Sequence, residues 1–338
     1  MNKNTKSMIK NMALFIGLIC FTLWMILKEQ SINEIVDVFK SLKYQYMVIG
    51  LGFMVVFLLL EGINIRRTLK NLDKKITVKQ SFRYALIGFF FSAITPAASG
   101  GQPMQIFYMN KDGISAGKST LALLINLMCM QIVTISMAFI SVFVNNRIMN
   151  KALTALFSIG ISLNLLALLL LLISIFSRRL SRGLVKFSLK ILKIFKAKNY
   201  TQKRKKIAKE LRKYHESSKY IKGNKKLIFK NLLTTYIQFI FYYAISYCVY
   251  LALGFTQSNV FEMITMQSLL FATVSGIPSP GAVGVSEGAF IEIYRMVYPV
   301  SLIRSATIAL RFLNFYLFVF ISGIVIIASN LKVKRESN

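Results

Sequence analysis

The chain has 338 residues, of which 55% are hydrophobic and only 16% are charged, and its mean hydropathy is +0.56. A soluble globular protein of this length is far less apolar, so the composition indicates a polytopic membrane protein. The formal net charge is +31. Because Lys and Arg of membrane proteins collect on the cytoplasmic side and favour anionic lipid, we expect lipid, and no nucleic acid, as the anionic partner.

Six stretches are close to the length of about 20 apolar residues that a helix needs to cross a bilayer. We expect the first to stay in the protein as a signal anchor, because no small-residue cleavage site follows it. The six predicted spans are Asn11 to Leu27, Tyr46 to Ile65, Ser119 to Val144, Ala152 to Phe176, Asn231 to Leu253, and Ser305 to Ser329.

The orientation of these spans is predicted from the basic residues in the short loops. The loop after the second span is strongly basic, whereas the loop before it balances Lys against Glu29, Glu34 and Asp37. We therefore expect a multi-pass protein of a bacterial-type cell membrane with both termini in the cytoplasm. Lys332, Lys334 and Arg335 near the C-terminus agree with this orientation.

Two apolar runs are too short to cross the bilayer, and each leads into a stretch rich in Gly and Pro. The run Tyr84 to Ile94 leads into Thr95 to Pro103, and the run Glu262 to Gly276 leads into Pro278 to Gly288. Irregular backbone at membrane depth persists only when it is packed inside protein or lines a wet cavity. We interpret the two segments as re-entrant hairpins, the first entering from the cytoplasm and the second from outside.

The predicted fold class is therefore all-α: a polytopic membrane helix bundle of about six full spans plus two re-entrant helical hairpins in an inverted repeat. The whole chain, 1–338, forms one integral membrane domain, with halves at 1–147 and 152–330. The alternative interpretation treats each hairpin as two ordinary short crossings, which gives eight or more spans.

A strongly basic loop, 178–230, separates the two predicted halves and must face the cytoplasm. Its only acidic residues are Glu210 and Glu216. Between Leu184 and Lys196, Lys residues alternate with Leu, Ile and Phe, a pattern suited to a helix that lies on the anionic inner leaflet. A loop that is merely solvated and fixes topology is the alternative.

The glycines of both interrupted segments are candidate phosphate ligands, because N–H groups of permissive backbone converge on anions. A sharp hairpin also needs Gly and Pro for its geometry alone. Polar side chains accompany these glycines, and lipid-facing sequence rarely contains such groups. The predicted headgroup site from these two segments comprises Thr95, Ser99, Gly100, Gly101, Gln102, Pro280, Gly281, Gly284 and Glu287.

Two ionisable residues lie within predicted spans, Glu61 in the second and Arg311 in the sixth. A charge near the bilayer centre costs at least about 2.5 kcal/mol, so Arg311 should face the bundle interior and meet a carboxylate or a phosphate. Its candidate protein partners are Glu287 and Glu292. A structural Arg–Glu pair that locks the second hairpin is the alternative to a lipid site. Glu61 and Glu287 are also candidate proton carriers.

The sequence contains no cluster typical of catalysis or of a metal centre, so we predict no catalytic residue, metal or cofactor. Cys20, Cys129 and Cys248 lie in apolar stretches, and His215 is the only histidine. The segment 112–120 resembles a nucleotide-binding loop, but its Gly113 is one residue too close to Lys118 for the phosphate-loop spacing.

Taken together, the two interrupted segments, Tyr108 and Gly113 after the first, and Ala309-Leu310-Arg311 resemble the lysylphosphatidylglycerol synthase transmembrane (flippase-like) family. The resemblance covers nearly the whole chain. It implies a membrane bundle that moves aminoacylated phosphatidylglycerol, or another phospho-linked lipid, between leaflets, which in bacteria gives resistance to cationic peptides. By motif position it assigns the candidate site role to Gly100, Gly101, Gln102, Pro280, Gly281, Gly284, Glu287 and Arg311.

One departure from the family concerns enzyme activity. Members that synthesise the lipid carry a soluble aminoacyltransferase domain after the membrane part, whereas this sequence stops at Asn338. We therefore expect a translocator and not a complete enzyme. The alternative is a membrane subunit, or remnant, of a lysylphosphatidylglycerol synthase whose soluble part is a separate chain.

Overall fold

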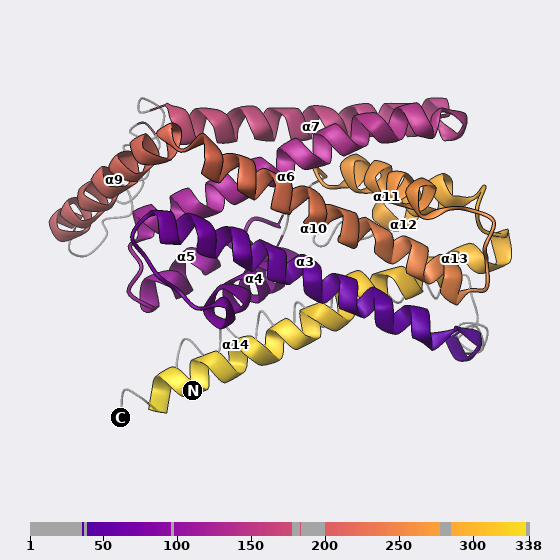
Figure 1. Cartoon of the computed structure of the whole chain (residues 1–338), viewed down its shortest axis with the longest axis horizontal. Coiled ribbons are helices and arrows are strands. Elements are labelled where there is room, and N and C mark those ends of the chain that lie inside the picture. The colour runs from indigo at the N-terminus through magenta and orange to yellow at the C-terminus, as the bar shows by residue number, and fades with distance from the viewer. Residues whose placement is uncertain are drawn as a thin grey trace.

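The computed structural model describes Val36, residues 39–95, 98–177, Gly183, 200–277 and 285–335. Within these ranges the fold is entirely helical, with eleven α-helices. Figure 1 shows one elongated bundle in which the long helices run roughly along the same axis. The all-α prediction is confirmed.

Five helices in the described ranges are long and apolar enough to cross a membrane, and they match five of the six predicted spans. The predicted span at 11–27 lies outside the described residues. Several helices extend beyond the predicted apolar stretch, because helical hydrogen bonding continues into the basic ends. The five are α3 (Tyr44–Asn71), α6 (Ala116–Val144), α7 (Lys151–Phe176), α10 (Lys225–Ala252), and the joined helices α13 (Val300–Arg311), η4 (Phe312–Tyr316) and α14 (Leu317–Arg335).

Two pairs of short helices lie toward opposite ends of this bundle (Figure 1). The first pair is α4 (Val78–Ala93) with α5 (Gly101–Lys111), and the second is α11 (Val260–Val274) with α12 (Val285–Tyr294). The longest of the four, α4, has 16 residues and spans about 24 Å at ~1.5 Å per residue, less than the ~30 Å hydrocarbon core. None of the four is long enough for a crossing of its own; their depth in a membrane stays a prediction.

The end of α11 inside the bundle is held by a buried side chain of α7. The last carbonyl groups of a helix lack partners within that helix, and an apolar surrounding supplies none. Asn164, which is 3% exposed, donates from Nδ2 to the Ala272 carbonyl at 3.2 Å and to Ser275 Oγ at 3.0 Å. Gly160 permits this contact, because a Cβ there would lie 2.4 Å from the Thr273 carbonyl oxygen.

Helix α9 (Tyr200–Gly223) fastens the ends of α6 and α7. The Glu210 carboxylate accepts a hydrogen bond from the N–H of Gly117 in the first turn of α6, at 2.9 Å. Tyr214, Ser218 and Lys222, each one turn further along α9, donate to the carbonyls of residues 174, 175 and 176 at the end of α7. An acidic group thus meets a helix N-terminus and a basic group a helix C-terminus, as the helix dipole favours.

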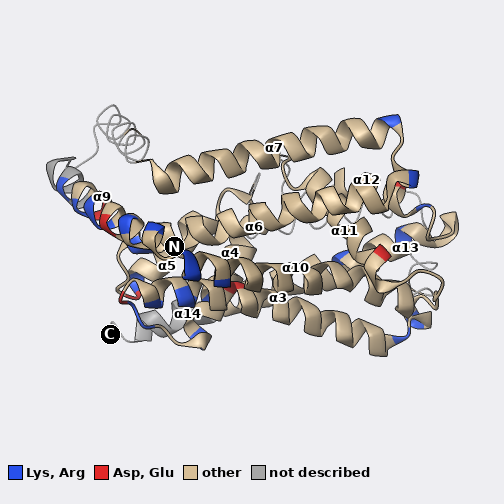
Figure 2. Ribbon diagram, turned by 45° about the horizontal axis from the view of Figure 1, so that its top comes forward, with Lys and Arg blue, Asp and Glu red and all other residues tan. Residues whose placement is uncertain are grey.

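The basic residues are concentrated at the end of the bundle where α9 lies (Figure 2). That end also contains the loop between α3 and α4 and the C-terminal end of α5. The predicted amphipathic pattern at 184–196 lies outside the described residues, so the described part of the basic loop is α9 itself.

Replacing Asn164 with Leu should lower the free energy of unfolding by about 1–3 kcal/mol, because the carbonyl at the end of α11 loses a buried donor. The measurement is thermal unfolding in detergent, with Leu166→Ala as the control. Leu166 lies on the same helix and is 51% exposed, so its truncation should change the midpoint much less. Equal midpoints for Asn164→Leu and wild type would contradict this role.

Single cysteines at Lys75 and Gln257 should react on opposite sides of the membrane. Both positions are exposed, and they lie in loops at opposite ends of the bundle (Figure 1). With the three native cysteines replaced by Ala, a membrane-impermeant maleimide added to intact cells should label the cysteine at 257 alone. Labelling of the cysteine at 75 before the cells are opened would show that the predicted orientation is wrong.

Candidate functional site

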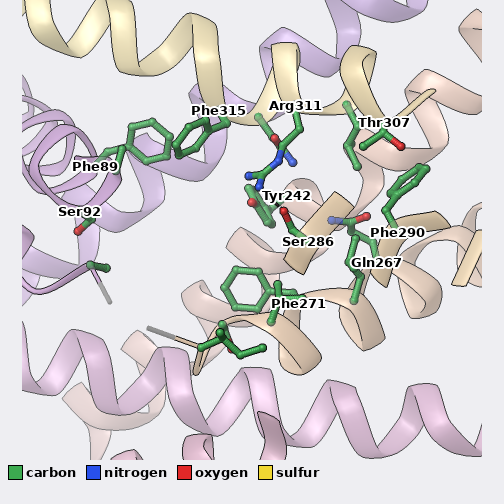
Figure 3. Close-up of a pocket in the computed structure, with 18 residues that line it drawn as sticks. Phe89, Ser92, Tyr242, Gln267, Phe271, Ser286, Phe290, Thr307, Arg311 and Phe315 are labelled. Atoms are coloured by element: carbon green, nitrogen blue, oxygen red, sulfur yellow. Dashed lines mark hydrogen bonds between the residues drawn. The ribbon is translucent and has the colours of Figure 1, made fainter. Parts of the chain in front are cut away.

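A cavity of about 260 Å³ is lined by residues of both short helix pairs. The first pair and its turn contribute residues such as Ser92 and Ala98, and the second contributes residues such as Gln267 and Ser286. Tyr242 of α10 and the helix that carries Arg311 complete the lining (Figure 3). Two segments that lie about 170 positions apart in the sequence, one near residue ~100 and the other near residue ~270, therefore border one site.

Arg311 lies at this cavity and forms an ion pair with Glu287. Arg311 Nε lies 2.9 Å from Glu287 Oε1, and the two side chains are 13% and 8% exposed. Ser286 Oγ accepts a hydrogen bond from Arg311 Nη2 and donates one to Glu287 Oε2 at 2.9 Å. Of the two predicted partners of Arg311, the structure brings Glu287 to it.

The backbone immediately after Arg311 departs from α-helical geometry. Residues Phe312–Tyr316 form a π-helical turn that joins α13 to α14. Such turns widen a helix locally and occur frequently at functional sites. The turn contains Asn314 and Phe315, which line the same cavity as Arg311.

The cavity wall combines aromatic rings with a few polar groups (Figure 3). Arg311 Cζ lies 5.1 Å from the centre of the Phe315 ring, within cation–π range. Gln267 accepts a hydrogen bond from the Tyr294 hydroxyl at 3.0 Å. Asn314 is 6% exposed and its Oδ1 has no hydrogen-bond partner in the described part of the chain. This wall therefore offers a cation, an unsatisfied acceptor and apolar surface.

The predicted residues of the first segment form the turn and the start of α5, and they do not line the cavity. Thr95 Oγ1 donates to the Phe91 carbonyl at 2.6 Å and accepts from the Gly100 N–H at 2.8 Å. Gly101 lets α5 approach α4, because a Cβ there would lie 2.1 Å from Ser92 Oγ. Ser99 is exposed and Gln102 is partly buried. Ala98 reaches the cavity, and its φ of 53° is in the left-handed region.

The remaining predicted acidic residues lie elsewhere. Glu61 Oε1 of α3 accepts a hydrogen bond from Gln105 Nε2 of α5 at 3.3 Å. Glu292, the second predicted partner of Arg311, instead pairs with Arg295 at 3.0 Å and accepts from Asn150, which caps α7. Pro280, Gly281 and Gly284 lie outside the described residues. In the described part of the chain no group of His, Cys, Asp and Glu could hold a metal ion.

Sequence analysis missed several polar residues that border the cavity. These are Ser92, Tyr242, Gln267, Thr307 and Asn314. Each is a polar residue within an apolar or aromatic run, so a search for polar residues inside apolar helices would have selected them. That signal does not show which helix face they occupy.

The comparisons with known proteins agree with this architecture. A UPF0104 membrane protein of Archaeoglobus fulgidus is 22% identical over 309 residues, which covers 89% of this chain and 92% of that protein. The family described as Lysylphosphatidylglycerol synthase TM region matches residues 12–323. The matched range includes both short helix pairs, the ion pair and the cavity. The chain is therefore a multi-pass membrane protein of the lysylphosphatidylglycerol synthase TM region family.

Proposed function

We propose that this protein translocates a phospho-linked lipid, of the aminoacylated phosphatidylglycerol kind or a related one, between the two leaflets of the cell membrane. The observation that carries the proposal is the cavity bordered by both short helix pairs, with Arg311 at its wall. A lipid headgroup that crosses a bilayer needs polar groups sheltered at depth, which an ordinary apolar bundle lacks.

The chemistry of the cavity suits a phosphodiester. A guanidinium presents donors in a planar fork that matches phosphate oxygens. Because Glu287 pairs with Arg311, the arginine need not remain as an isolated buried charge between transport cycles. An arriving phosphate would bind Arg311 beside the Glu287 carboxylate or would displace that carboxylate from it. A headgroup ammonium could then pair with Glu287, and a donor from the headgroup could satisfy Asn314 Oδ1.

Access to the two leaflets would alternate between the two short helix pairs. In the proposed topology they enter from opposite sides, and each contributes one side of the same cavity. Small movements of α4–α5 or of α11–α12 would then open the headgroup site toward one leaflet at a time. Binding of lipid would shift the population between these states.

The basic end of the bundle would face the cytoplasm, as the positive-inside rule predicts. The outer surface of α9 carries exposed Lys205, Lys209, Arg212 and Lys219. We propose that these groups lie near the anionic inner leaflet, where each contributes about 1 kcal/mol of attraction. Through its contacts with α6 and α7, α9 would also fix the position of the bundle at this surface.

Removing both members of the ion pair should slow lipid movement at least tenfold. The variant is Arg311→Ala with Glu287→Ala, because loss of one member alone leaves an uncompensated buried charge that destabilises the fold. The measurement is transfer of a fluorescent phospholipid across the membrane of liposomes that contain purified protein.

The matched control is Arg295→Ala with Glu292→Ala. It also removes one Arg–Glu pair and leaves the net charge unchanged, but this pair is 51% and 34% exposed and does not line the cavity. The control should transport like wild type. Equal rates for wild type and the Arg311, Glu287 double variant would refute the site assignment, whereas an inactive wild type would refute the function.

The second candidate function is a membrane subunit, or remnant, of a lipid aminoacyltransferase that acts with a separate soluble synthase. The description of the matched family, which names a synthase, favours it. Lipid extracts from cells lacking the gene should distinguish the two. If the protein translocates lipid, a lipid species should be depleted from the outer leaflet while its total amount is unchanged. Loss of the species from the whole cell would instead support synthesis.

A further inference from the structure

A second polar site lies between α3, α5 and α10, apart from the Arg311 cavity. Glu61 of α3 contacts Gln105 of α5, and the same Gln105 Nε2 also donates to the Tyr84 carbonyl at 3.0 Å. Gln105 is 2% exposed. Gly88 of α4 makes room for it, because a Cβ there would lie 2.3 Å from Gln105 Nε2. The amide of Gln105 is thus held against the Glu61 carboxylate by close helix packing.

The antiparallel register of α3 and α10 places Gln238 opposite Glu61. On one side, Asn64 Nδ2 donates to Thr235 Oγ1 at 3.0 Å. One turn beyond Glu61 in the other direction along α3, the centres of the Phe57 and Tyr242 rings lie 4.7 Å apart. Glu61 lies one turn from both Phe57 and Asn64, and Gln238 one turn from both Thr235 and Tyr242. The two residues therefore share one level on facing sides of the two helices.

The unused hydrogen-bonding groups of Gln238 independently point to a ligand at this place. It is fully buried, and both its Nε2 and its Oε1 lack a partner in the described part of the chain. Each polar group of an amide that is buried without a partner destabilises the fold, so such groups are rare unless another species satisfies them. An amide can donate to an ionised carboxylate and can accept from a protonated carboxyl.

We propose that Glu61, Gln105 and Gln238 form a proton-binding site that couples lipid movement to the transmembrane pH gradient. A proton from water would bind the Glu61 carboxylate, which is only partly buried. The Gln238 amide would accept from the protonated form and donate to the ionised form. Because Tyr242, one turn from Gln238, lines the cavity, the change at Glu61 would reach the headgroup site. This coupling rests on the proposed translocation.

Two titratable groups near this site, Arg67 and Tyr84, already have hydrogen-bond partners. Arg67 is bound by Asn64, Asn231, Thr234 and the Lys230 carbonyl, each within 3.1 Å. The Tyr84 hydroxyl donates to Asp112, which also pairs with Arg83. The titratable side chains on the elements packed around Glu61 include Arg67 of α3, Tyr84 of α4, Tyr108 of α5, Tyr242 of α10, and Arg311 and Tyr316 at or beside η4.

The first test is infrared titration of the purified protein, which detects a protonated carboxyl and does not require transport. Wild type should show a carboxyl band that is lost as the pH rises, and Glu61→Gln should lack that band. Gln238→Leu should change the pH of half-conversion by about one unit, the equivalent of one charge-assisted hydrogen bond. Gln131→Leu is the matched control, because Gln131 Oε1 is also buried without a partner but lies on α6. If the titrating carboxyl bands of Glu61→Gln were the same as those of wild type, the proposal would be overturned.

The second test measures lipid movement in liposomes with and without an imposed pH gradient. The ratio of the two rates should exceed about threefold for wild type and fall to about one for Glu61→Gln. A ratio that stays at the wild-type value in Glu61→Gln would refute the coupling. If wild type moves no lipid under either condition, the proposed translocation fails, while the infrared result still decides whether Glu61 binds a proton.

Discussion

The requirement that backbone polar groups find partners governs this structure, because its short helices end inside an apolar bundle. Hydrocarbon supplies no hydrogen bonds, so each such end needs a side chain from another element or from its own turn. Asn164 meets this need for α11, and Thr95 does so for the turn between α4 and α5. These contacts fix the helix ends that border the cavity. Loss of either would disturb the site without any change in the residues that line it.

The surroundings of the Arg311–Glu287 pair bear on whether it only joins two helices or also belongs to a ligand site. Stability alone would be served as well by apolar residues of similar volume, since burial of two charges costs about as much as their attraction returns. The pair is nevertheless placed at a cavity wall, beside an unsatisfied Asn314 acceptor and a π-helical turn. Charge, unused hydrogen-bonding capacity and irregular backbone coincide there, which favours a ligand site over a simple lock between helices.

Much of the fold could be predicted from the sequence, because long apolar runs and basic loops report directly on spans and their ends. The pairing of Arg311 with a nearby Glu was predictable from the cost of an isolated charge, but the choice between Glu287 and Glu292 was not. Both lie on α12, and only the packing of α12 on α13 places Glu287 beside Arg311. Similarly, glycine identity indicated a tight segment but could not distinguish a phosphate ligand from close packing such as that of Gly101 on Ser92.

The arrangement of α3 and α10 suggests how two sites in one bundle could communicate. A polar cluster around Arg67 clamps the two helices near the basic end, and aromatic contacts at Phe57 join them beside the cavity. Further along α3, a Cβ at Gly50 would lie 2.8 Å from the Leu313 side chain, so α3 also packs closely against the π-helical turn that follows Arg311. A shift of α3 relative to α10 would therefore move the turn after Arg311 as well. Because packed interiors move between discrete arrangements, a change at Glu61 and a change at the ion pair would tend to occur together.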